Sequence, residues 1–265
     1  MTYELNDESP DPGGIQYNVV SGLEADNVVA PDPETLVGVL AQRIATLTKE
    51  RVELAGVCHI ALSGGSTPKL LYQRLVSDPD YRSLPWDAMH FWIVDERCVP
   101  FDDDRSNYKM IRELLFDHIP VEPSQIHPMM VMEPDGDRRY EDDLRSALDN
   151  DQHGGRLDMV LLGMGDDGHT ASLFPDSPAL NEIERWVVFN DGELVVPPPR
   201  MTMTFRLIND AREIAILVTG QSKQHRMTDV IVSVRDVQRV PVTGIGGGVG
   251  PGNVEWYLDK AAVPD

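Results

Sequence analysis

The stretch LDMVLLGMGDDGHTASLFP, residues 157–175, decides the fold of this chain. Its apolar run, residues 159–162, predicts a buried strand. Three glycines follow within the next six residues, and glycine lets the backbone adopt positive φ angles and lets a ligand approach closely. The turn ends on His169, two residues after Asp167. Because histidine titrates near neutral pH, and because open α/β sheets place active sites at such strand ends, we expect a proton-transfer site here.

The same turn matches a nucleotide-binding pattern that its surroundings do not support. Residues 163–168, GMGDDG, satisfy G-x-G-x-x-G. That pattern requires a long helix to begin at once, within a first βαβ unit. Pro175 and Pro178 follow quickly, and the turn lies past the middle of the chain. Because proline ends or kinks a helix, we do not expect a nicotinamide or flavin site.

Composition excludes several classes of partner. The net charge of -21 argues against nucleic acid and anionic membranes, since both require a basic surface. Two cysteines, Cys58 and Cys98, are too few for a disulfide framework. No metal-ligand motif appears, so we expect no metal site. No apolar stretch has the length of a membrane span, and no signal region is visible. We expect a reduced, cytoplasmic, soluble protein.

Apolar periodicity divides the chain into alternating strands and helices. The expected strands are 58–62, 91–94, 159–162, 201–207 and 214–218. Helices are expected to begin at the caps Asp32, Thr67 and Ser106, with two more around 140–148 and after 223. This alternation predicts a doubly wound, Rossmann-like α/β fold, with a mostly parallel sheet and helices on both faces.

The domain organisation is expected to be simple. Residues 1–30 are predicted to form a flexible, acidic lead-in and a first strand, and residues 31–265 a single α/β domain. The glycine-rich run 244–252 is predicted to be a flexible surface loop. We also expect the acidic run 102–104 to be a solvated loop.

Four predicted strands end in polar motifs. These are SGGST at 63–67, DER at 95–97, GMGDDGH at 163–169 and TGQSK at 219–223. Because the carboxyl ends of strands in a doubly wound sheet lie along one edge, we expect these motifs to converge.

The motif chemistry suits an anionic substrate. SGGST before Pro68 offers backbone N–H groups and a helix dipole to an anion, although an ordinary capped helix start explains it equally well. Arg97 and Lys223 are candidates for the positive charge. No G-x-S-x-G elbow supports a serine hydrolase triad. Activation of water by His169 as a general base therefore fits better than covalent catalysis.

Longer motifs carry a family resemblance. They are LSGGSTPKLLYQRL from Leu62, DERCVPFDDDRSNY from Asp95, GMGDDGHTASLFP from Gly163, PRMTMT from Pro199 and VTGQSK from Val218. Together they resemble the 6-phosphogluconolactonase branch of the glucosamine-6-phosphate isomerase/6-phosphogluconolactonase family, over nearly the whole chain. The resemblance implies a sugar-phosphate isomerase type of fold. It also implies hydrolysis of 6-phospho-D-glucono-1,5-lactone in the oxidative pentose phosphate pathway, without cofactor or metal.

The resemblance also implies roles for individual residues. His169 is expected to be the general base, with Asp167 beside it. Gly64, Gly65, Ser66 and Thr67 are expected to form the phosphate-side loop, and Arg97, Arg200 and Lys223 to contact the anionic substrate. A few convergent cations would then bind an anion within an otherwise acidic protein. The implied partners are a small sugar-phosphate lactone and, at most, a few copies of the chain itself.

Two other readings remain open. A glucosamine-6-phosphate isomerase/deaminase of the same group would carry H-I-A-F-N-E-P after the glycine turn and D-E-Y after the earlier strand. This chain has HTASLFP and DERCVP in those places. A non-catalytic sugar-phosphate sensor would need a DNA-binding module, and no segment is available for a helix-turn-helix.

Overall fold

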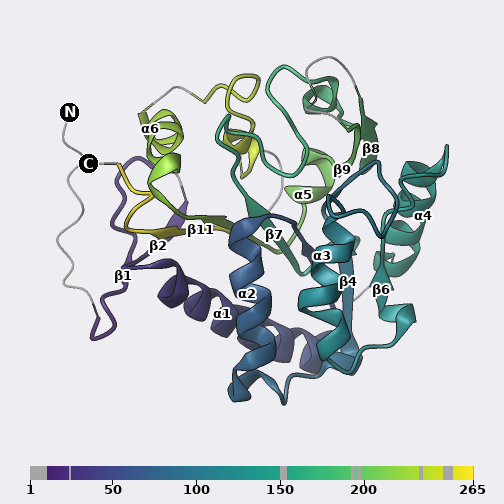
Figure 1. Ribbon diagram of the computed structural model, residues 1–265, viewed down its shortest axis with the longest axis horizontal. Coiled ribbons are helices and arrows are strands. Elements are labelled where there is room, and N and C mark those ends of the chain that lie inside the picture. Colours follow the sequence, from purple (N-terminus) through teal and green to yellow (C-terminus); the bar gives the residue numbers. More distant parts are fainter. Residues whose placement is uncertain are drawn as a thin grey trace.

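An eight-stranded sheet runs through the protein in the computed structural model (Figure 1). The structure describes residues 11–23, 25–149, 154–191, 195, 198–232, 235–246 and 253–264. In spatial order its strands are β1 (Gln16–Tyr17), β2 (Asp26–Ala30), β11 (Asn253–Asp259), β10 (Glu213–Val218), β7 (Met159–Gly163), β3 (Cys58–Leu62), β4 (Met89–Ile93) and β6 (Ile126–His127). All neighbouring pairs are parallel except β1 with β2 at one edge. The expected mostly parallel sheet is confirmed.

Helices cover both faces of this sheet. They are α1 (Pro33–Ala55), α2 (Ser66–Ser77), α3 (Asn107–Leu114), α4 (Gly136–Leu148), α5 (Phe205–Ile208) and α6 (Gln224–Val232). Figure 1 shows α1, α2 and α3 on one face and α6 on the other. Short 3₁₀ turns are η1 (Pro79–Tyr81), η2 (Trp86–Ala88), η3 (Phe116–His118), η4 (Pro123–Gln125), η5 (Pro178–Asn181), η6 (Gln221–Lys223) and η7 (Pro241–Gly244). This arrangement is the doubly wound fold that the sequence predicts.

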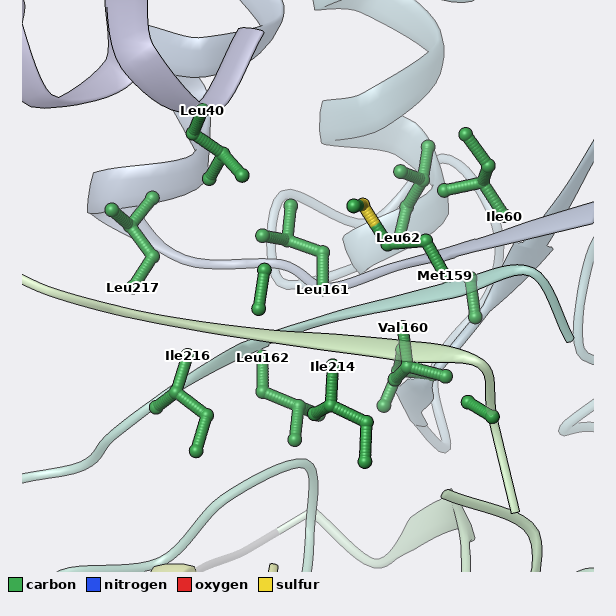
Figure 2. Close-up of a cluster of buried hydrophobic side chains, with 14 of the residues drawn as sticks. Leu40, Ile60, Leu62, Met159, Val160, Leu161, Leu162, Ile214, Ile216 and Leu217 are labelled. Atoms are coloured by element: carbon green, nitrogen blue, oxygen red, sulfur yellow. The ribbon is translucent and has the colours of Figure 1, made fainter. Parts of the chain in front are cut away.

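The central strands are apolar on both faces because each face is covered. In Figure 2, Leu161 and Leu217 point toward Leu40 of α1, whereas Leu162 and Ile216 point to the opposite side of the sheet. All five side chains are at most 1% exposed. A parallel strand buried on both sides has no polar face, which explains the unbroken apolar runs in the sequence.

The order of the strands reverses between β3 and β7. From β3 the chain proceeds outward through β4 to β6, and after β7 it proceeds the other way through β10 to β11. The crossovers on the two sides of this point lead in opposite directions, so the loops that leave β3 and β7 separate from each other. A crevice forms there at the carboxyl ends of the strands, and in open α/β sheets ligands bind in it.

A second, smaller sheet stands beside this crevice, and the sequence did not predict it. It contains β5 (Asp95–Arg97), β9 (Arg200–Met203) and β8 (Val187–Asn190), all antiparallel. The two sheets are joined at the end of β4, where the N–H of Val94 donates to the carbonyl of Leu62 and its carbonyl accepts from the N–H of Met203. The DER motif is therefore a strand of this sheet.

Two helix starts agree with the sequence and one does not. The Asp32 side chain accepts from Thr35 N–H at the start of α1, and the Ser106 side chain caps α3. The expected cap Thr67 is wrong, because α2 begins two residues earlier than expected, at Ser66, with Gly65 as its N-cap. Gly65 has a φ of 113°, which a threonine would adopt only under strain, and the helix makes no side-chain cap bond.

The expected strand over 201–207 is partly wrong. The strand β9 ends at Met203, and the next residues form the single helical turn α5. The N–H groups of Leu207 and Ile208 both donate to the carbonyl of Thr204, and both side chains are fully buried. Alternating apolar residues thus arise here from a strand followed by a turn, a combination that period 2 alone does not distinguish.

Several remaining expectations fall partly outside the described residues. Residues 1–10 of the lead-in and 247–252 of the glycine-rich run are not described. Gly244 is buried, which contradicts a surface loop at that position. A Cβ there would lie 2.5 Å from Phe205 Cζ, so the absence of a side chain allows the ring to pack. Among the described helices, none has the length and apolar character needed to cross a membrane.

Candidate active site

The four polar motifs converge on one cleft at the switch point between β3 and β7, as expected. The cleft has a volume of about 480 Å³. Every site residue expected from the sequence lines it: Gly64, Gly65, Ser66, Thr67, Arg97, Asp167, His169, Arg200 and Lys223. Main-sheet loops supply most of these residues, and the small sheet supplies the two arginines.

His169 and Asp167 form a hydrogen-bonded pair. His169 Nδ1 lies 2.5 Å from Asp167 Oδ1, and the His169 backbone N–H donates to the same oxygen. Burial opposes ionisation of Asp167, but the side-chain hydrogen bond from His169, the charge of His169 and two backbone N–H groups together outweigh burial, so the pKa of the carboxyl is lowered. An ionised Asp167 accepts a hydrogen bond from Nδ1–H of the neutral imidazole, and this tautomer leaves the lone pair on Nε2 available. The pair thus has the geometry of a base with its orienting acid.

Gly165 makes this pairing possible. Its N–H donates to the carbonyl of His169 at 2.8 Å and closes the turn. A Cβ at this position would lie 2.2 Å from His169 Nδ1 and 2.7 Å from Asp167 Oδ1. The glycine pattern in this motif therefore serves packing against a histidine, and no dinucleotide is needed to explain it.

Two guanidinium groups face the cleft from the small sheet. Arg97 and Arg200 are directly opposite each other in the pairing of β5 with β9. Arg97 Nη1 donates to the carbonyl of Arg105, and Arg200 Nη1 to that of Pro198. Burial, and then the charge of Arg97, lowers the pKa of Arg200. Among the described residues no carboxylate forms an ion pair with either guanidinium, although Asp95 also lines the cleft and its charge acts on Arg200. We call the part of the cleft formed by Arg97 and Arg200 the arginine wall, or positive wall.

The acidic run near Arg97 does not neutralise it. Asp103 pairs with Arg105 at 2.7 Å, and Asp104 pairs with Lys109 at 2.6 Å. These partners come from the same loop and from α3. The local acidity is therefore balanced outside the cleft, consistent with the expected solvated loop.

The SGGST turn and the start of α2 form another part of the cleft wall. Gly64 is required because a Cβ there would lie 1.8 Å from Asn107 Oδ1. Thr67 Oγ1 lies 2.9 Å from Thr219 Oγ1, which joins the turn after β3 to the loop after β10. On that loop, Lys223 Nζ lies 2.6 Å from Asp166 Oδ1. A helix N-terminus and an ammonium group thus share this wall, and both favour an anion.

An aromatic side chain that the sequence analysis did not select connects the base to the arginines. The Phe174 ring centroid lies 4.6 Å from that of His169, and the Arg200 guanidinium carbon lies 5.8 Å from the Phe174 ring. Phe174 is 3% exposed and lines the cleft. In the sequence, only its position in the HTASLFP motif indicated that Phe174 belongs to the cleft.

Sequence reasoning also missed a buried polar network in the wall of the cleft, formed by Asp95, Asn107 and Ser172. Asp95 Oδ2 accepts from Ser172 Oγ at 2.5 Å, and Asn107 Nδ2 donates to the Asp95 carbonyl at 2.7 Å. Glu96 is fully buried and accepts from the backbone N–H groups of Arg97 and Asn107. Burial raises the pKa of Glu96 despite these hydrogen bonds. Strand alternation could have indicated this arrangement, since it places the side chains of residues 95 and 97 on one side of β5 and that of residue 96 on the other.

A metal centre finds no support in the described residues. Among them, no group of three or more histidine, cysteine, aspartate or glutamate side chains has an arrangement that could hold a metal ion. The cleft instead contains an imidazole, the start of a helix and three cationic side chains. These features define a class of doubly wound α/β protein whose switch point is built to hold a small, negatively charged substrate next to a proton acceptor.

Comparisons with known proteins specify the class further. A family model described as glucosamine-6-phosphate isomerases/6-phosphogluconolactonase matches residues 31–256. The 6-phosphogluconolactonase of Synechocystis sp. is 37% identical over 246 residues, 88% of this chain and 98% of that protein. The crystal structure of 6-phosphogluconolactonase from Thermotoga maritima has a TM-score of 0.74 and 29% identity, and the match covers 88% of this chain and 99% of that chain.

A longer protein also contains a similar region. The GDH/6PGL endoplasmic bifunctional protein of Oryctolagus cuniculus is 38% identical over 240 residues. That match covers 87% of this chain, which spans only 29% of the bifunctional protein. The chain belongs to the glucosamine-6-phosphate isomerase/6-phosphogluconolactonase family, as its motifs predicted.

Proposed function

We propose that this protein is an enzyme that hydrolyses 6-phospho-D-glucono-1,5-lactone to 6-phospho-D-gluconate, a step of the oxidative pentose phosphate pathway. The observation that carries the proposal is the His169–Asp167 pair, which shares a cleft with the Arg97 and Arg200 guanidinium groups. A base and unneutralised cations in one cleft suit water attack on the ester of an anionic substrate. The relatives named 6-phosphogluconolactonase support the same reaction.

The reaction begins with the activation of water. His169 Nε2 accepts a proton from water while the water oxygen bonds to the lactone carbonyl carbon, C1. Asp167 stabilises the imidazolium that forms, since its carboxylate accepts a hydrogen bond from the Nδ1–H, with 2.5 Å between Nδ1 and Oδ1. The carbonyl oxygen becomes an oxyanion, which the positive wall of Arg97 and Arg200 stabilises.

Ring opening completes the reaction. The tetrahedral intermediate collapses, the bond between C1 and the ring oxygen breaks, and the imidazolium returns its proton to that oxygen. One water is consumed and no redox change occurs, so the step balances with one water and the side chains named above. The phosphate group lies against the start of α2 at Gly64–Thr67 and against Lys223, where the helix dipole and the ammonium favour it.

The cysteines indicate the cellular compartment in which the enzyme works. Cys58 and Cys98 are both free thiols, the former buried and the latter partly exposed. Free thiols persist in the reducing cytoplasm, which is where we place the reaction. A monomer or a small homo-oligomer would suffice, because all the residues named above come from one chain.

Turnover measurements distinguish the proposed function from the two alternatives. Freshly generated 6-phosphogluconolactone is mixed with the purified chain, without added metal or nucleotide, and acid release is followed above the spontaneous rate. The account predicts fast turnover and no ammonia release from glucosamine 6-phosphate. Ammonia release would indicate a deaminase. Binding of 6-phosphogluconate without turnover of either substrate would indicate a sensor.

A further inference from the structure

The three cations that line the cleft differ in their partners. Arg97 and Arg200 donate to backbone carbonyls. Lys223 instead has a carboxylate partner, because its ammonium lies 2.6 Å from Asp166 Oδ1. Both members of this pair line the cleft. The ammonium on the SGGST side therefore already has a carboxylate as its ion-pair partner, whereas neither arginine has one among the described residues.

Asp166 is separate from the catalytic pair although it is adjacent in sequence. The carboxylate of Asp167 is engaged by His169, and the carboxylate of Asp166 is engaged by Lys223. The backbone of Asp166 is held in place, since its carbonyl accepts from Arg226 Nε of α6 at 3.3 Å. Its side chain is 76% exposed, whereas that of Lys223 is 19% exposed. The carboxylate is thus the accessible member of the pair and lies where an incoming anion would meet it.

We propose that Asp166 is a specificity-determining residue that competes with the substrate phosphate for Lys223. This inference rests on the proposed function, in which Lys223 contacts the phosphate. An ammonium has three N–H donors at one compact charge, so a phosphate oxygen and the Asp166 carboxylate are drawn to the same group. The displaced carboxylate then repels the phosphate dianion. Asp166 therefore weakens the binding of every phosphorylated ligand and favours release of a phosphorylated product.

The expected size follows from the exposure of the pair. Ion pairs open to solvent on one side contribute little, and removal of such a competitor tightens binding roughly two- to five-fold. The effect is confined to ligands that carry a phosphate. It decreases as salt screens the exposed carboxylate.

The test is the variant Asp166→Asn, which keeps the shape of the side chain and removes its charge. Binding of 6-phosphogluconate and of inorganic phosphate is measured by calorimetry at low salt, with gluconate as the ligand without phosphate. We expect the Kd of both phosphate ligands to fall two- to five-fold and gluconate binding to stay unchanged. In a Lys223→Met background the gain from Asp166→Asn should be smaller, because competition for the ammonium is lost and only the repulsion between carboxylate and phosphate remains. Asp104→Asn is the matched control, because Asp104 also lies 2.6 Å from a lysine but outside the cleft.

The outcomes separate this inference from the proposed function. A Kd that rises in Asp166→Asn would mean that Asp166 positions Lys223, and the inference would be overturned. An unchanged Kd, or no phosphate binding by any form of the protein, would overturn it as well. Because binding is measured without turnover, tighter phosphate binding by a protein that does not hydrolyse the lactone would leave the inference standing while the proposed function fails.

Discussion

The variant Gly165→Ala tests how the turn holds its histidine. The added Cβ would lie 2.2 Å from His169 Nδ1 and Cε1 and 2.7 Å from Asp167 Oδ1. Gly165 does not have a positive φ, so alanine suits its backbone and the perturbation is a steric clash alone. The imidazole must retreat to restore ordinary contact.

The size of this retreat sets the expected loss of activity. Ordinary contact begins at 3.4 Å, so a ring atom now 2.2 Å from the new carbon must move by 1.2 Å. A misplacement of about 1 Å lowers the rate of an enzymatic reaction on the order of 100-fold. Overpacking of this kind also destabilises a fold by about 1–3 kcal/mol. We therefore expect kcat for the lactone to fall roughly 100-fold in a protein that still folds.

The assay is initial-rate hydrolysis of fresh lactone, with urea unfolding of each protein beside it. Gly163→Ala is the matched control from the same turn, because its Cβ would meet only the Leu217 carbonyl, at 3.9 Å. It should keep its turnover within a few-fold of the wild type. A Gly165→Ala enzyme with wild-type kcat would refute the reasoning, as would an equal loss in Gly163→Ala.

Three further predictions concern stability. Glu96→Gln should lower the free energy of unfolding by about 1–3 kcal/mol, because an amide cannot accept all the N–H bonds of the buried carboxylate; an unchanged urea midpoint would contradict this. Asp158→Asn should cost about 3–5 kcal/mol by thermal unfolding, because it removes one partner of the buried Arg51–Asp158 pair; a loss below 1 kcal/mol would argue against it. Burial, and then the charge of His90, lowers the pKa of His127 from 6.5 to about 4. The free energy of unfolding should therefore be unaffected by His127 above pH 6.5 and fall by up to about 3 kcal/mol as the pH drops to 4, because the unfolded chain binds the proton first. His127→Gln should flatten that pH dependence of the urea midpoint, and equal slopes in both proteins would rule out His127 as its source.

The main sheet could be predicted because its signals are local. The strands β3, β7 and β10 are largely apolar, since helices cover both faces. The cap at Asp32 is likewise local, because its side chain accepts from the N–H of Thr35, three positions further along the chain. The carboxyl ends of parallel strands share one edge, so the convergence of the polar motifs followed from the fold class alone.

The small sheet could not be predicted in the same way. Its strands are three or four residues long, and their pairing joins Asp95 to Thr202, far along the chain. Such strands are determined by tertiary contacts and not by their own periodicity. The same holds for the contacts of Ser172 and Asn107 with Asp95, which require three separate segments to meet. Motifs could therefore identify the candidate site residues of the cleft, but not the hydrogen-bond network in its wall.

The central claim is that His169 Nε2 activates the water, and replacement of this residue tests it most directly. His169→Asn retains a polar side chain but has no base, and general-base catalysis contributes about 10²–10⁴-fold. After subtraction of spontaneous hydrolysis, we predict that kcat falls by that factor. The circular dichroism spectrum and the urea midpoint should stay close to those of the wild type. A folded His169→Asn protein that hydrolyses the lactone at a near-wild-type rate would contradict the account.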